Sequence, residues 1–184
     1  MNNPPSLAWT WVWEEYDFKL QVSEDVSAIF DAHRQHGDKM ECGGQLFISP
    51  SFDNGLWLSS ATLPHSSDKS SKHWVELNSY RCDYEQSQAR SYGLVFAGYW
   101  HTHPQLIPAL SNQDKISIER FYHANKQIIK SPIFVIVGTS ACQNGIKAWA
   151  YKDEVYLEAV AKWILMDIFL KFNYLLFTLA SKST

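Results

Sequence analysis

Residues 94–104 read Leu-Val-Phe-Ala-Gly-Tyr-Trp-His-Thr-His-Pro, an apolar run that leads into two histidines. An uncharged run of this kind is typical of a strand that is buried on both faces. The sequence therefore predicts a buried strand over residues 94–100 that presents His101 at its C-terminal end. Side chains two residues apart in an extended chain point to the same side, so His101 and His103 are expected to lie together.

Periodic patterns on both sides of this run predict further strands and helices. Strands are expected over residues 9–13, 18–22, 45–49, 56–63, 132–138 and 146–151, and helices over residues 23–36, 83–92, 111–125 and 154–180. Ser23 and Ser111 each stand where a helix N-cap is needed, with acids in the following turn. Residues 64–73 are polar and turn-rich, which predicts a loop. This order of elements predicts an α/β fold in which a mixed sheet is flanked by helices.

Length and composition indicate one domain over residues 1–184, since the 46% of hydrophobic residues can fill a single core. The 16 Lys+Arg and 19 Asp+Glu give a net charge of −3, so no nucleic-acid partner is expected. Three widely spaced cysteines form no CxxC motif, which excludes a zinc ribbon and a thioredoxin-like centre. The N-terminus lacks the basic region of a signal peptide, and a cytoplasmic protein is expected.

The two histidines and Asp114 predict a metal centre. Asp114 lies in the first turn of the helix expected after His103, near enough to return a carboxylate to the same point. Two imidazoles and one carboxylate leave the fourth tetrahedral position open to water, as in catalytic zinc sites. Bound Zn²⁺ would lower the pKa of that water to about 7. The alternative is a pair of strand-end histidines beside an aspartate that only caps a helix.

Glu41 and Ser111 are the candidate catalytic residues beside this centre. Glu41 precedes Gly43 and Gly44, where the chain can approach a neighbouring strand closely. A carboxylate there could carry the proton of the water to a leaving amine. The hydroxyl of Ser111 could donate a hydrogen bond to a developing oxyanion.

The pattern Glu…His-x-His-x7-Ser-x2-Asp resembles the signature of the JAMM (MPN+) zinc metalloproteases, which include the JAB-domain peptidases. Its five positions here are Glu41, His101, His103, Ser111 and Asp114. The surrounding Glu-x-Gly-Gly-x-Leu and Gly-x-Trp-His-Thr-His-Pro segments are also similar, and the resemblance covers roughly residues 18–151. Ile48 departs from the pattern, since many members have another glycine there.

This resemblance implies an MPN+ fold, with a mixed sheet between helices in a three-layer, cytidine-deaminase-like arrangement. It implies that the two histidines and Asp114 bind zinc, that Glu41 is the general acid/base and that Ser111 assists the tetrahedral intermediate. The family hydrolyses isopeptide or peptide bonds after the C-terminus of ubiquitin or ubiquitin-like proteins. The compact chain looks like prokaryotic members, some of which accompany E1- and E2-like proteins in antiviral operons. The implied partner is a ubiquitin-like protein or its conjugate, for example an E1/E2-conjugated nucleotidyltransferase.

Two further functions stay open: a non-catalytic adaptor for a ubiquitin-like tail, and a processing peptidase for a sulfur-carrier precursor. Zincins, zinc deaminases and TIM-barrel amidohydrolases are excluded because their motifs are absent or their ligands would lie elsewhere in the chain. His65, His73 and Trp100 are candidate substrate contacts. The first two lie in the loop that the resemblance equates, over residues 64–79, with the family's first insertion.

Aromatic and apolar residues gather at both ends of the chain. Trp9, Trp11 and Trp13 lie in an N-terminal extension, residues 1–17, and an apolar helix is expected over residues 154–182. Asp167 and Lys171 lie inside that apolar segment, so a membrane span, which needs about 20 nearly uncharged residues, is not expected. We expect the apolar helix to meet a partner or a second copy in a homodimer, and the surplus aromatics to mark a partner surface.

Overall fold

The computed structural model describes residues 4–50, 52 and 55–163. Most of the strands in these residues belong to one mixed sheet. Its nine strands are β1 (Leu7–Trp13), β2 (Phe18–Ser23), β3 (Gly43–Ser49), β4 (Leu56–Ala61), β7 (Val95–Thr102), β8 (Ile133–Val137), β9 (Ile146–Lys152), β10 (Val155–Glu158) and β11 (Val160–Trp163). Their order is β10-β9-β8-β7-β3-β4-β2-β1-β11. The sheet is nearly barrel-shaped, and the indole of Trp13 in β1 donates across it to the carbonyl oxygen of Leu157 in β10, at 2.9 Å.

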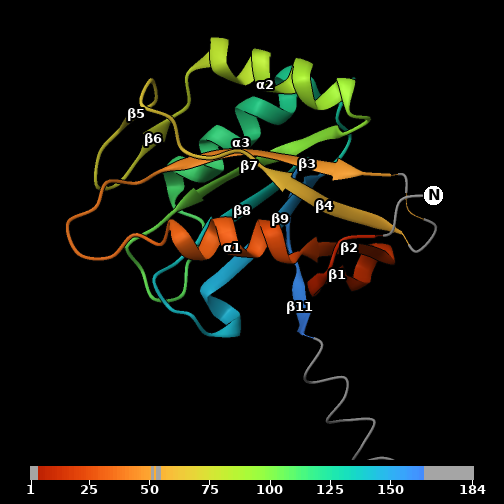
Figure 1. The fold of residues 1–184 in the computed structure, drawn as a ribbon, viewed down its shortest axis with the longest axis horizontal. Coiled ribbons are helices and arrows are strands. Elements are labelled where there is room, and N and C mark those ends of the chain that lie inside the picture. Colours follow the sequence, from red (N-terminus) through yellow and green to blue (C-terminus); the bar gives the residue numbers. More distant parts are fainter. Residues whose placement is uncertain (1–3, 51, 53–54, 164–184) are drawn as a thin grey trace, which may run out of the picture.

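Three α-helices in the described residues flank this sheet: α1 (Glu24–Ala32), α2 (Ser79–Ser91) and α3 (Asn112–Asn125). In Figure 1, α2 and α3 lie on one side of the sheet and α1 on the other. Val26 and Phe30 of α1 belong to the main hydrophobic core, whereas Ile118 of α3 packs in a smaller cluster. A separate hairpin of β5 (Lys69–Ser70) and β6 (Val75–Glu76) and two short 3-10 turns, η1 (Glu14–Tyr16) and η2 (Gln143–Gly145), complete the fold. The prediction of a mixed α/β domain is confirmed.

Strand β7 pairs with antiparallel β3, the neighbour that was predicted, and with parallel β8 on its other side. It extends two residues past the predicted end, so His101 lies inside the strand. Gly98 explains how β7 and β8 fit together: its φ of +149° suits glycine, and a Cβ there would collide with the carbonyl oxygen of Ile133.

Two helices begin or end at residues other than those predicted. Ser23 caps α1 as expected, with its hydroxyl accepting from the amide of Val26, but the helix ends at Ala32 rather than at residue 36. Helix α2 begins at Ser79, four residues early, because the Asn78 side chain accepts a hydrogen bond from the amide of Arg81.

The helix predicted over residues 154–180 is wrong for the part that the structure describes. Asp153 and Glu154 have φ of 49° and 64°, and they form a two-residue turn that folds β10 back onto β9. Strand β11 then pairs with β1, so residues 155–163 extend the sheet. The remainder of the predicted helix, with its expected partner or dimer face, lies outside the described residues.

The N-terminal tryptophans do not form a partner surface, which corrects that expectation. Strand β1 was predicted correctly, but it lies between β2 and β11 rather than in an extension. Trp9, Trp11 and Trp13 are at most 3% exposed, and Trp9 stacks on Trp163 with 4.5 Å between ring centroids. The aromatic surplus at this end of the chain therefore fills the core.

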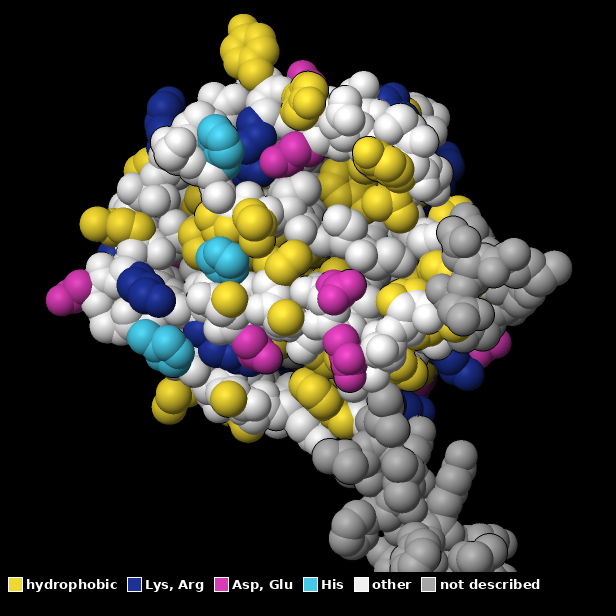
Figure 2. Space-filling view, in the orientation of Figure 1, with side chains coloured by type: hydrophobic (Ala, Val, Ile, Leu, Met, Phe, Trp, Pro, Cys, Tyr) yellow, Lys and Arg dark blue, Asp and Glu magenta, His cyan; other side chains and the backbone are white. Residues whose placement is uncertain are grey.

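The surface mixes charged and apolar side chains. On the face shown in Figure 2, basic, acidic and hydrophobic groups are interspersed. Within the part of the chain that the structure describes, no helix has the length and apolar character needed to cross a membrane.

Candidate metal centre

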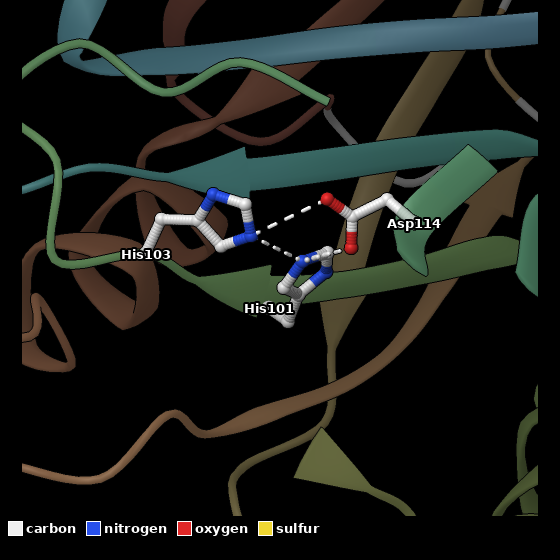
Figure 3. Close-up of side chains that lie close together, drawn as sticks. All are labelled: His101, His103 and Asp114. Carbon is white, nitrogen blue, oxygen red and sulfur yellow. Dashed lines mark hydrogen bonds and ion pairs between the residues drawn. The ribbon is translucent and has the colours of Figure 1, made fainter. Parts of the chain in front are cut away.

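The end of β7 and the start of α3 bring the three predicted metal ligands together (Figure 3). His101 is the penultimate residue of β7, and His103 follows directly after the strand. The amide of His103 donates to the carbonyl oxygen of Val137 at the end of β8, which fixes the chain where it leaves the sheet. Asp114 comes from the first turn of α3 and points at both rings.

The donor atoms of these residues have the spacing that a single ion needs. The two histidine Nε2 atoms are 3.0 Å apart, and Asp114 oxygens lie 3.1 Å from that of His101 and 3.5 Å from that of His103. Donors at about 2.0–2.2 Å from a tetrahedral zinc ion lie roughly 3.3 Å from one another. The three side chains therefore form a group that can hold a metal ion.

Ser111 holds Asp114 in place through a capping box, as the sequence predicted. The Ser111 hydroxyl accepts from the amide of Asp114 at 3.1 Å, and the amide of Ser111 donates to the carboxylate at 2.7 Å. Only one oxygen of that carboxylate is held by the cap, so the other still faces His101. The Ser111 hydroxyl keeps its own proton available to donate, and the residue is exposed.

Glu41 lies beside the two histidines although sixty residues separate them in the sequence. Its Oε1 is 4.0 Å from Nε2 of His103, and the side chain is 4% exposed. The following segment pairs with β7, with Gly43 opposite His101. A Cβ at Gly43 would collide with the carbonyl oxygen of Trp100, so glycine is what lets β3 approach β7 here.

Burial and charge shift the pKa values of the acids in opposite directions. Burial raises the pKa of Glu41 to about 7, with His101 lowering it in part and Asp114 raising it. Burial would also raise the pKa of Asp114, but hydrogen bonds from His101 and Ser111 bring it down to about 2. Burial, with the neighbouring His101, lowers the pKa of His103. The centre thus places an aspartate whose pKa is lowered beside a buried glutamate that titrates near neutrality.

The pKa of Glu41 predicts that metal-free protein loses stability as the pH rises. The folded state keeps the Glu41 proton between its unfolded pKa of 4.5 and about 7, so the unfolded state binds fewer protons in that window. The free energy of unfolding of Glu41→Gln should therefore rise by about 3 kcal/mol relative to that of wild type between pH 4 and pH 8. Urea unfolding of both proteins in a chelator measures this difference. Equal pH dependence in the two proteins would contradict it.

A cleft of about 790 Å³ opens over the centre and includes Glu41, His101 and Asp114 in its lining. His73, a predicted substrate contact, also lines it. The ring of His65 lies outside the lining and contacts the Ser67 hydroxyl at 2.8 Å. Trp100 lies in the floor of the cleft, but it is 1% exposed and its indole donates to the carbonyl oxygen of Thr62, so its surface for a substrate is small.

The structure also contains a buried network of charged side chains beside the cleft, which was not predicted from the sequence. Arg81 of α2 binds Asp68 through two nitrogens, at 2.8 and 3.1 Å, and Glu85 at 2.7 Å. The side chains of Arg81 and Asp68 are each 7% exposed. Asp68 also accepts from the amides of His65 and Asn78, and Gln45 of β3 donates to Glu85. This network ties the segment after β4 to α2 and the sheet.

Arg81→Met should destabilise the protein by about 3–5 kcal/mol, because it leaves two carboxylates without their buried partner. The matched control is Lys69→Met, since Lys69 pairs with Glu76 at 3.5 Å on the exposed β5–β6 hairpin. That change should cost less than about 1 kcal/mol. Urea denaturation of the three proteins measures both effects, and equal costs would show that the Arg81 network is no stronger than a surface pair.

Comparison with known proteins shows the fold alone. No protein-family model matches the chain, and no curated protein matches it significantly in sequence. Among solved structures, it is similar to the solution structure of a structural-genomics target protein from Desulfitobacterium hafniense, with a TM-score of 0.54 and 18% identity. The match covers 74% of this chain and 87% of that one.

Proposed function

We propose that this protein is a JAMM-type zinc metalloprotease that hydrolyses the bond after the C-terminus of a ubiquitin-like protein. The observation that carries the proposal is the convergence of Glu41 on the His101, His103 and Asp114 group, with its Oε1 4.0 Å from Nε2 of His103. A structural zinc site would have a closed set of ligands. This one has three, opens into a cleft and has a carboxylate beside it whose pKa is about 7.

Each residue of the site has a part in hydrolysis under this proposal. His101, His103 and Asp114 would hold zinc, which when bound lowers the pKa of water and polarises a carbonyl. Glu41 takes the proton of the attacking water and returns it to the leaving amine, a role that suits a pKa close to neutrality. Ser111 orients Asp114 through the capping box and donates a hydrogen bond from its hydroxyl to the oxyanion.

The substrate class rests on the sequence resemblance and on the residues that line the cleft. We infer an MPN+ fold with the three-layer, cytidine-deaminase-like arrangement, since helices flank both sides of the mixed sheet (Figure 1). The β5–β6 hairpin and His73 stand beside the cleft in the segment that the resemblance equates with the family's first insertion. An extended C-terminal tail is a substrate that a hairpin edge can hold by backbone hydrogen bonds.

Trapping with Glu41→Ala tests this function. The variant should keep its zinc and accumulate uncut conjugates, which mass spectrometry of the captured proteins would identify by their ubiquitin-like tail. Wild-type protein should release the same conjugates as two products. If wild type binds zinc and the tail but leaves the bond intact, the protein is an adaptor; if the trapped partner is a sulfur-carrier precursor, it is a processing peptidase.

A further inference from the structure

A second, larger cavity adjoins the cleft over the metal centre, with which it shares Asp83, Gln86, Tyr99 and Phe121, and reaches the end of the sheet where β7 begins. Its volume is about 1040 Å³, near the upper end of the range for small-molecule sites. Its lining follows β7 from Leu94 to Tyr99, so that its far end, at Leu94, lies about 23 Å along the strand from His101. In Figure 1, α2 runs from the side of the β5–β6 hairpin toward the end of the sheet where β7 begins.

The wall of this cavity is mainly apolar. Large side chains from six strands line it: Trp13, Phe18, Ile48, Leu56, Phe96 and Leu157. Strands β1 and β10 meet there, since the indole of Trp13 donates to the carbonyl oxygen of Leu157, and residues of α2 and α3 complete the lining. Val95 and Ile128 on the same lining are 50% and 84% exposed. Binding of a hydrocarbon chain in a cavity of this kind is favourable, because it removes apolar surface from water.

Three cations stand at the same cavity: Arg90, Lys130 and Lys152. The strand registers bring two of them together, since Gly98 and Ala150 both lie opposite Ile133, which places the residues before β8 beside the start of β7 and the end of β9. Arg90 comes from the last turn of α2. Among the described residues, none of the three cations forms an ion pair, although Lys152 lies 4.5 Å above the ring of Tyr16. Asp83 is the acidic side chain of the lining.

We propose that this cavity binds a free fatty acid, with the hydrocarbon chain against the apolar wall and the carboxylate at Arg90, Lys130 and Lys152. An apolar cavity with unpaired cations at its edge complements an amphipathic anion. The chain's own residues 164–184 fit less well, because they carry one acid, Asp167, against Lys171 and Lys182. Strand β11 also leads away from the cavity: Val160 lies opposite Val12, and Trp163 lies opposite Trp9.

Calorimetric titration of the full chain with octanoate, decanoate and laurate, below their micelle concentrations, tests the proposal. Laurate should saturate one site with a negative heat-capacity change. Each two added carbons should tighten binding by about tenfold, as expected for buried methylene groups. Dodecyltrimethylammonium, which has the same chain length and the opposite charge, should bind at least about tenfold more weakly than laurate.

Matched double variants locate the site. Lys130→Gln with Lys152→Gln should weaken laurate binding by about tenfold or more, whereas Lys39→Gln with Lys69→Gln removes two exposed cations elsewhere and should leave it unchanged. Four results overturn the proposal: no saturable uptake by the full chain, no dependence on chain length, equal affinity for the cationic amphiphile, or equal loss in both double variants. None of these results depends on peptidase activity, so the two proposals stand or fall separately.

Discussion

Glu41→Gln should lower the turnover of a ubiquitin-like conjugate by about 10²–10⁴-fold while the protein keeps its full zinc content. The amide has the shape of the carboxylate but cannot take up the proton of the attacking water. Glu41 lies 4.0 Å from His103 and outside the group of three donors that can hold the ion, so its replacement removes no ligand. Turnover of a conjugate, measured beside zinc content by atomic absorption, separates the two properties.

Glu76→Gln is the matched control, since Glu76 is an exposed carboxylate on β6 that lines the same cleft. It should retain turnover within a few-fold, because its pairing with Lys69 is an exposed surface contact. Wild-type rates in Glu41→Gln would remove the carboxylate from the mechanism. Loss of zinc in that variant would instead make Glu41 a metal ligand, and the proposed division of roles would be wrong.

The parts of the site that the sequence predicted are those encoded by local rules. The strand before His101 follows from an uninterrupted apolar run, and the cap formed by Ser111 and Asp114 follows from their spacing of three residues. Glu41 was placed beside them through its two glycines, which permit a close approach between strands. The sequence could predict that these distant residues lie close together, because each one is found at the end of a strand or helix that has a recognisable pattern.

The failures share a physical cause, which is that tertiary pairing decided the local conformation. Asp153 is a common turn residue, but Glu154 adopts a positive φ without the glycine that usually follows in such turns, so the local signal for the β9–β10 hairpin was weak. Arg81 and Asp68 stood in polar segments typical of solvent-exposed chain, yet each is 7% exposed because the other neutralises it. The second cavity likewise depends on how far the sheet closes, which period-2 patterns do not encode.

His103→Ala should abolish both zinc binding and turnover, in contrast to Glu41→Gln. Removing one of three donors leaves two, and His103 is 6% exposed, so water replaces its imidazole poorly. Zinc at a hundredfold excess over its dissociation constant should stabilise wild type against unfolding by about 2.7 kcal/mol. The same concentration should leave His103→Ala unchanged.

His73→Ala provides the control for that experiment, because His73 lines the same cleft without belonging to the group of three donors. It should keep one zinc ion per chain and the full zinc-dependent stabilisation, measured by urea unfolding with and without metal. Retention of zinc by His103→Ala would show that the ion is held elsewhere. Loss of zinc from His73→Ala would add a fourth ligand, closing the position that hydrolysis requires, and a structural metal site would then replace the catalytic one.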